Sequence, residues 1–282
     1  MKSESNLESS FSVVCAISHG LYQPWLDILY KGQVPTWLSA PRPVGFEVIH
    51  FHGKSGGALV SSFDKFHEKI RWTNRWVATP LRWLDEGLGF PIRSFIPRTS
   101  RSKNLNLLDK SIQIDFLDIY ATMKWKDLAV LDYFYRETDA DYLFMTTTSS
   151  YIRSFKLMEK IASLPTHGLY AGAVAYPGAN FAAGNNRLYS RDVVKKILEA
   201  RQKLRCGVIE DLALGNLCNF LSIQLIELPK RNIGSLEELE LITDEEIQDQ
   251  FHFRLTSGPR ENRQDEKIMN QLHSRVRIID GW

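Results

Sequence analysis

Short runs of apolar, β-branched residues alternate along this chain with segments of helical periodicity, and this alternation constrains the fold more than any other feature. Phe11–Ile17 (FSVVCAI) and Phe46–Phe51 (FEVIHF) have the composition of buried strands, whereas Leu128–Tyr135 repeats its apolar residues at helical spacing. Similar patterns predict strands at residues 91–96, 112–116, 142–145 and 223–228, and helices at 61–83 and 235–250. Strands separated by helices predict an α/β fold with a mainly parallel central sheet flanked by helices. Ligands of such folds bind at the carboxyl ends of the strands.

The composition is that of an ordinary globular protein. With 282 residues, 44% of them hydrophobic, the chain is long enough to bury a large core. We expect a polar tail at residues 1–10 and a single domain over 11–282, because no linker or internal repeat interrupts the pattern. The 35 basic and 33 acidic side chains leave a net charge of +2, which gives no reason to expect a nucleic-acid partner.

The sequence contains no pattern typical of a membrane span or of secretion. No apolar run is long enough to cross a bilayer, so no transmembrane segment is expected. The N-terminus MKSESNLESS lacks the apolar core of a secretory signal. The three cysteines, Cys15, Cys206 and Cys218, are odd in number and fit no metal-binding or redox spacing. These features favour a cytoplasmic protein, either free or peripherally attached to the inner membrane, and they predict no particular oligomeric state.

Residues 139–215 contain three short motifs whose order and spacing are informative. The first, DADYLFMTTTSSYI, is a strand that stops in a run of hydroxyl residues, Thr146–Ser150, here called the hydroxyl run. The second, YPGANFAAGNNRLYSRDVV, contains a Gly/Asn segment typical of a turn and then a helix predicted to follow an N-cap at Ser190. The third, GVIEDLALGNLC, places Glu210 and Asp211, here called the acidic pair, before a predicted small-residue turn at Gly215.

Together with DFLDIY at residues 115–120, these motifs resemble the nucleotide-sugar glycosyltransferases of the β-1,3-galactosyltransferase and Fringe type over roughly residues 112–218. The resemblance implies a GT-A fold, in which a Rossmann-like sheet holds a nucleotide diphosphate sugar and an acceptor site lies beside it. One departure is large, because Thr147, Thr148 and Ser149 stand where the family has a run of metal-binding aspartates. Neutral hydroxyls hold Mg²⁺ or Mn²⁺ poorly, so we expect no metal cofactor.

The resemblance also assigns roles near the acceptor. Inverting sugar transfer needs a carboxylate that takes the proton of the attacking acceptor hydroxyl, and the family's motif places this base at Asp211. The alternative is that Asp211 only favours the positive end of a helix that begins there. Glu210, Gly184 and Asn185 are expected to line the acceptor site, since a Gly/Asn turn lets the main chain approach a sugar.

Without a metal, the departing diphosphate needs cationic side chains. The family has a metal-binding histidine near the C-terminus, and the segment FHF at residues 251–253 resembles that position. The neighbouring Arg254 is suited to bidentate phosphate binding, and Arg260, Arg263 and Lys267 are further candidates. The alternative is that this polar tail is a solvated, charged surface. The expected donor-binding residues are Ser18, His19, Thr147, Thr148, Ser149, His252 and Arg254.

Three functions follow from these motifs. The first is an inverting, metal-independent glycosyltransferase that uses a nucleotide diphosphate sugar, with a UDP-sugar as first choice. Its acceptor would be a saccharide or a lipid-linked saccharide in bacterial surface polysaccharide synthesis. The second is a catalytically degenerate relative that binds nucleotide or glycan. The third is an interaction protein that shares only the sheet architecture. Response to nucleotides, with and without a chelator, separates the three.

Overall fold

The computed structural model describes residues 11–56, 87, 95–118, 122–258 and 263–281. An eight-stranded sheet has the order β3-β4-β2-β1-β5-β8-β7-β9, and a three-stranded sheet has the order β10-β11-β6. The large sheet consists of β1 (Val13–His19), β2 (Phe46–Lys54), β3 (Thr99–Arg101), β4 (Lys110–Leu117), β5 (Tyr142–Thr147), β7 (Tyr170–Val174), β8 (Ala182–Ser190) and β9 (Leu225–Glu227). The small sheet consists of β6 (Ser150–Ile152), β10 (Arg231–Ile233) and β11 (His252–Leu255).

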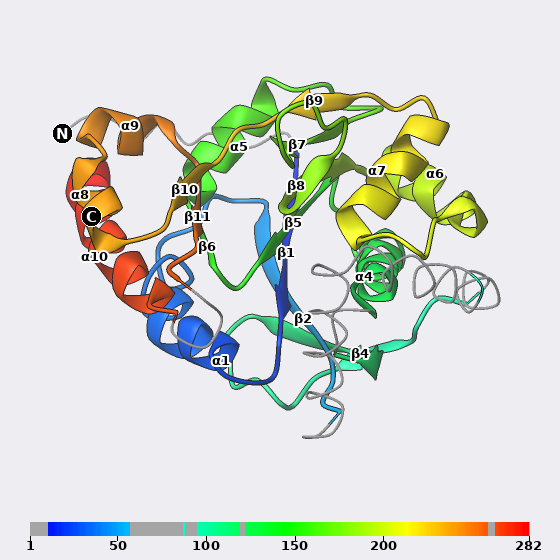
Figure 1. The fold of residues 1–282 in the computed structure, drawn as a ribbon, viewed down its shortest axis with the longest axis horizontal. Coiled ribbons are helices and arrows are strands. Elements are labelled where there is room, and N and C mark those ends of the chain that lie inside the picture. The colour runs from blue at the N-terminus through cyan, green and yellow to red at the C-terminus, as the bar shows by residue number, and fades with distance from the viewer. Residues whose placement is uncertain (1–10, 57–86, 88–94, 119–121, 259–262, 282) are drawn as a thin grey trace, which may run out of the picture.

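Helices cover both faces of the large sheet. In Figure 1, α4 (Met123–Glu137), α6 (Arg191–Glu199) and α7 (Glu210–Phe220) lie on one side, and α1 (Trp25–Asp27), α8 (Leu236–Leu241) and α10 (Asp265–Asp280) lie on the other. The remaining helical segments are η1 (Ile28–Gln33), α5 (Ser154–Ala162), η3 (Arg201–Lys203) and α9 (Asp244–Asp249). Within the described residues, no helix combines the length and apolarity needed to cross a bilayer.

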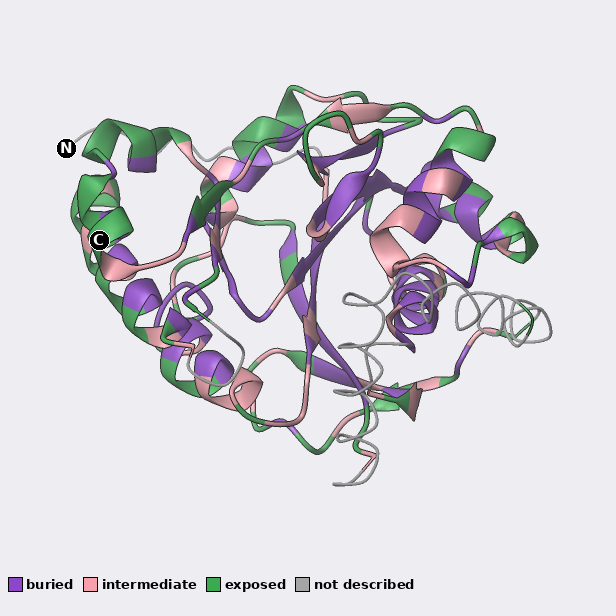
Figure 2. Cartoon of the chain, viewed as in Figure 1, coloured by how far each residue is buried: buried purple, intermediate pink, exposed green. Residues whose placement is uncertain are grey.

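The predicted α/β class, with a central sheet flanked by helices, is confirmed. The strands β4, β2, β1 and β5 are mutually parallel, and the predicted strands at 11–17 and 142–145 are neighbours in β1 and β5. The sheet as a whole is mixed, because β8 runs antiparallel to both β5 and β7. Side chains of β1 enter a different core on each face, so the strand reads as one uninterrupted apolar run. Figure 2 shows these buried strands between helices whose outer surfaces are exposed.

The prediction that the residues after 250 form a polar tail is wrong, because they contain β11 and α10. Helix α10 buries Ile268, Met269, Leu272 and Val276 on one face, and charged residues between them hide this pattern in the sequence. The single helix predicted at 235–250 is two helices, since Thr243 forms a capping box that starts α9. In the segment 91–96, residues 95 and 96 are not in a strand and residues 91–94 lie outside the described residues, as does the predicted helix at 61–83.

Two predicted turns also differ from the structure. Gly184, Asn185 and Asn186 lie within β8, where pairing with β7 jumps from Gly172–Arg187 to Val174–Ala182. The intervening residues of β8 therefore form an irregular bulge, which explains turn-like residues inside a strand. Gly215 lies inside α7, where a Cβ would stand 2.1 Å from the Cβ of Phe181. Close packing, not a turn, requires a glycine there.

Candidate functional site

The hydroxyl run spans the carboxyl end of β5 and the first residue of β6, and it is bonded to neighbouring elements. Thr146 Oγ1 donates to the carbonyl of Asn185 in β8 at 2.9 Å. Thr148 Oγ1 donates to the carbonyl of Ser18 in β1 at 3.2 Å. These contacts join the ends of three adjacent strands of the large sheet. The run is therefore a fixed part of the site, positioned by long-range hydrogen bonds.

Two serines of the run, Ser149 and Ser150, connect it to the C-terminal part of the chain. Arg263 Nη2 donates to Ser149 Oγ at 3.2 Å, while its guanidinium pairs with the buried carboxylate of Asp265. Ser150 Oγ shares a hydrogen bond of 3.0 Å with His252 Nε2. Thr147 differs, because its Oγ1 is buried and has no hydrogen-bond partner among the described residues. A buried, unpaired hydroxyl is a group that a bound ligand can satisfy.

His19 lies in a buried chain of polar contacts that leads away from the run. Its Nδ1 is 3.1 Å from Thr148 Oγ1, and its Nε2 is 2.6 Å from His50 Nδ1. His50 Nε2 lies 3.7 Å from Asp109 Oδ2, and Arg42 holds that carboxylate with two nitrogens. Burial lowers the pKa of both histidines, with the neighbouring His50 adding to the effect at His19. His19 therefore orients Thr148, and its predicted direct contact with a donor stays a prediction.

Three cations, Lys230, Arg254 and Arg263, here called the cation cluster, lie near the run. Burial, and then the charge of Arg254, lowers the pKa of Lys230 to about 8. Burial, and then the charge of Arg263, lowers the pKa of Arg254 to about 10. Arg254 Nη1 is buried and has no hydrogen-bond partner within the described part of the chain. Like charges held together out of water destabilise one another, so the cluster favours binding of an anion.

Arg254 and His252 alternate with Phe253 in β11, as the strand pattern of residues 251–254 predicted. The two positions differ in what they can contact. His252 is fully buried against Phe144, and burial followed by the charges of Lys230 and Arg254 lowers its pKa. In this structure His252 holds Ser150, whereas Arg254 keeps a guanidinium nitrogen unpaired. Of the other predicted tail cations, Lys267 is exposed on α10 and Arg260 lies outside the described residues.

The acidic pair occupies the first turn of α7, against the bulge of β8. A Cβ on Gly184 would stand 3.2 Å from Glu210 Oε1 and 3.8 Å from Asp211 Cβ, so the main chain of β8 closely approaches both carboxylates. Burial, followed by the charges of Asp211 and Asp127, raises the pKa of Glu210 to about 7. Burial also raises the pKa of Asp211. A carboxylate with a raised pKa accepts a proton more readily, as a general base must.

Lys230 connects the acidic pair to the cation cluster. Its Nζ donates to Asn185 Oδ1 in the bulge, and the charge of Asp211 partly opposes the lowering of its pKa. Sequence reasoning missed Lys230, because a single lysine in the segment LPKR carries no motif. The fold thus brings most of the predicted site residues to one region, and Ser18 and His19 of β1 contact Thr148 there. The residues in this region are Thr147, Ser149, Gly184, Asn185, Glu210, Asp211 and Arg254.

The hydroxyl run does not fit a divalent metal ion. Its hydroxyls carry no charge, and those of Thr146, Thr148, Ser149 and Ser150 are engaged by neighbouring elements. In the described segments of the chain, no group of three or more His, Cys, Asp or Glu side chains is placed to hold a metal. No chemical step is therefore assigned to a metal.

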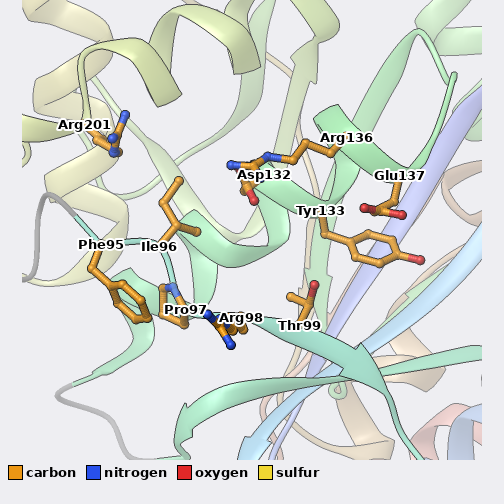
Figure 3. A pocket seen from close by; sticks show the side chains of 10 residues that line it. All are labelled: Phe95, Ile96, Pro97, Arg98, Thr99, Asp132, Tyr133, Arg136, Glu137 and Arg201. Atoms are coloured by element: carbon orange, nitrogen blue, oxygen red, sulfur yellow. Dashed lines mark ion pairs between the residues drawn. The ribbon is translucent and has the colours of Figure 1, made fainter.

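A pocket of about 360 Å³ lies elsewhere on the molecule, between the segment before β3 and helix α4 (Figure 3). Three of its side chains are arginines, but Arg136 pairs with Asp132 at 2.9 Å and Glu137 adds a second acid. The charges of its arginines and acids therefore nearly balance. Its lining consists of Phe95, Ile96, Pro97, Arg98, Thr99, Asp132, Tyr133, Arg136, Glu137 and Arg201.

No family model and no curated protein matches this chain. Among solved structures, it is similar to the glycosyltransferase GlyE of Streptococcus pneumoniae TIGR4, with a TM-score of 0.45 and 10% sequence identity. The apo form of that protein gives a TM-score of 0.43 and 11% identity. Each comparison covers 96% of this chain but only 63% and 62% of the other chain, respectively. This likeness is too distant to support a conclusion about fold or function.

Proposed function

We propose that this protein is a GT-A glycosyltransferase that moves a sugar from a nucleotide diphosphate sugar to a saccharide hydroxyl, with inversion and without a metal. The observation that carries the proposal is that the acidic pair and Lys230 meet at the β8 bulge: the pair approaches Gly184, and Lys230, whose pKa is lowered by burial and then by Arg254, donates to Asn185. A base for the acceptor and positive charge for the leaving group are the two requirements of such a transfer.

Asp211 is the proposed base. The acceptor hydroxyl forms a bond to the anomeric carbon while the bond from that carbon to the phosphate oxygen breaks. The proton of the hydroxyl passes to the Asp211 carboxylate, and the electron pair of the broken bond leaves with the nucleoside diphosphate. The raised pKa of Asp211, caused first by burial, strengthens it as an acceptor of that proton. Glu210, Gly184 and Asn185 are proposed to line the acceptor side.

Arg254 is the proposed anchor of the diphosphate. Its buried, unpaired Nη1 and the buried, unpaired hydroxyl of Thr147 are groups that phosphate oxygens can satisfy. Arg263 already contacts Ser149 and brings a second guanidinium to the same run. Four further residues are proposed to support the donor indirectly, through the contacts that hold the hydroxyl run in place. They are Ser18, His19, Thr148 and His252.

The finer parts of the proposal rest on the motif resemblance alone. They are a UDP-sugar as first donor to test, a saccharide or lipid-linked saccharide acceptor, and bacterial surface polysaccharide synthesis in the cytoplasm or at the inner membrane. A second candidate, a degenerate relative that binds nucleotide or glycan without turnover, is favoured by one observation, the replacement of the family's aspartates by Thr147, Thr148 and Ser149.

The test is thermal unfolding with UDP, GDP and other nucleoside diphosphates, followed by turnover of the matching nucleotide sugars, with and without excess EDTA. The proposal expects stabilisation by one nucleotide and hydrolysis or transfer of its sugar in EDTA. Stabilisation without turnover of any sugar supports the second candidate. No response to any nucleotide contradicts the proposal and favours a protein that shares only the sheet architecture.

A further inference from the structure

We propose that Lys230 and Arg254 together form a binding subsite for the terminal phosphate of a diphosphate, with Asn185 as the residue that positions Lys230. This inference deepens the proposed function and rests on it for the identity of the ligand as a nucleoside diphosphate. It also assigns Asn185 a role on the donor side of the β8 bulge, in addition to the acceptor contact expected from the sequence.

The backbone before Lys230 is held at a defined place. Leu228 N donates to the carbonyl of Gly172 in β7 at 2.9 Å, and Asn186 Nδ2 donates to the carbonyl of Leu228 at 3.3 Å. Lys230 follows two residues later, immediately before β10 of the small sheet. The segment that joins the two sheets is thus anchored to the bulge, which points its lysine toward Asn185.

The amine of Lys230 has hydrogen-bonding capacity left for a ligand. An ammonium group has three N–H donors, and the bond to Asn185 Oδ1 uses one of them. Arg254, in the strand that pairs with β10, has the unpaired Nη1 described above. Lys230 immediately precedes β10, whose Asn232 pairs with Arg254, so the two cations lie close together, and burial and then the charge of Arg254 lower the pKa of Lys230.

The chemistry of the subsite matches a phosphate with two negative charges. Two cations with free donors can neutralise such a group, whereas a carboxylate carries only one charge. Thr147 Oγ1 and Arg263, which donates to Ser149, extend the polar surface beyond one phosphate. A diphosphate therefore fits better than a single phosphate.

Inorganic pyrophosphate tests the subsite without any assumption about the base or the sugar. Its dissociation constant, and that of orthophosphate, would be measured by calorimetry for the wild type, Lys230→Met and Lys230→Gln. The matched control is Lys195→Met, which removes an exposed lysine of α6. Loss of a charge-assisted contact predicts pyrophosphate binding at least about 10-fold weaker in both Lys230 variants, and binding within about 2-fold of wild type in the control.

Two further readouts separate a binding role from a structural one. Lys230→Met removes a partly buried cation whose pKa is lowered by burial and then by the charge of Arg254, so its ligand-free melting temperature should be unchanged or higher. Wild-type affinity for pyrophosphate should also fall as the pH rises above about 8, where Lys230 loses its proton, and this fall should be smaller in Lys230→Met. Wild-type pyrophosphate affinity in both Lys230 variants, or a loss of affinity matched by a loss of folding in both, overturns the inference.

The experiment also distinguishes this inference from the proposed function. If the wild type turns over a nucleotide sugar and Lys230→Met does so with the same kcat and KM, the subsite is wrong and the glycosyltransferase stands. If pyrophosphate binding depends on Lys230 but no nucleotide sugar is turned over, the subsite stands and the proposed activity is wrong.

Discussion

Arg187 in β8 and Asp127 in α4 form an ion pair, with Nη1 and Oδ2 2.7 Å apart and side chains only 3% and 1% exposed. The pair joins the strand that carries the bulge to the helix that covers the sheet. Its charges also act on the acidic pair, since Asp127 raises and Arg187 lowers the pKa of Glu210, after the larger effect of burial. A buried ion pair that loses one partner leaves an uncompensated charge, so either residue is expected to be sensitive to substitution.

Substitution of Asp211 tests the assigned base. Asp211→Asn keeps the shape of the side chain and removes its ability to take a proton. We expect turnover to fall by at least about 10²-fold while nucleotide affinity changes little. Steady-state kinetics and calorimetry measure the two effects. Asp249→Asn, at an exposed position of α9, is the control; near-normal turnover of Asp211→Asn would rule out this base.

Substitution of Arg254 tests how the diphosphate is held. Arg254→Ala should weaken donor binding or turnover more than Arg254→Lys does, because lysine keeps the charge and loses only the fork-shaped geometry. Arg231→Ala removes an exposed arginine of the adjacent strand β10 and should have little effect. Activity should persist in excess EDTA. A strict requirement for Mn²⁺ or Mg²⁺ would be incompatible with the cation cluster as the source of positive charge.

The acidic pair predicts a specific dependence of stability on pH. The pKa of Glu210 rises from 4.5 to about 7 on folding, so its protonated form favours the folded state. This contribution is fully present below pH 4.5 and is lost as the pH rises through about 7. Glu210→Gln should therefore raise the free energy of unfolding by up to about 3 kcal/mol at pH 8 and change it little at pH 4.

Urea unfolding at the two pH values measures this effect. Glu240→Gln, at an exposed position of α8, should show no such difference between pH 4 and pH 8. An equal effect of Glu210→Gln at both pH values would mean that burial does not set the charge state of this carboxylate.

Gly215 should be intolerant of any side chain. A Cβ there would stand 2.1 Å from Phe181 Cβ, so Gly215→Ala forces α7 and the segment before β8 apart. We expect the free energy of unfolding to fall by about 1–3 kcal/mol, as for other overpacked sites. Gly234→Ala is the matched control, because its Cβ would meet only the end of the flexible Glu238 side chain. Equal denaturation midpoints for the two variants would show that α7 can move without cost.

The sequence alone determined the features that depend on local pattern. Both faces of β1 are covered, so VVCAI at residues 13–17 is apolar throughout and its strand can be predicted without its neighbours. The hydroxyl run, the acidic pair and Arg254 were found because short local motifs of the sequence resemble those of a known family. Helix α10 was missed because its buried residues are interleaved with charges that face water.

Only the tertiary structure decided which of these groups meet. Asn185 and Lys230 are 45 residues apart in sequence and are joined because the link between the two sheets is anchored on the β8 bulge. The bulge itself depends on strand pairing, which a Gly/Asn segment predicts only as a turn. Burial then gives different environments to two residues on the same face of β11. His252 lies in the core, whereas Arg254 keeps a hydrogen-bond donor unpaired. Periodicity records which residues face the core, whereas contacts between distant segments arise only when the chain is packed.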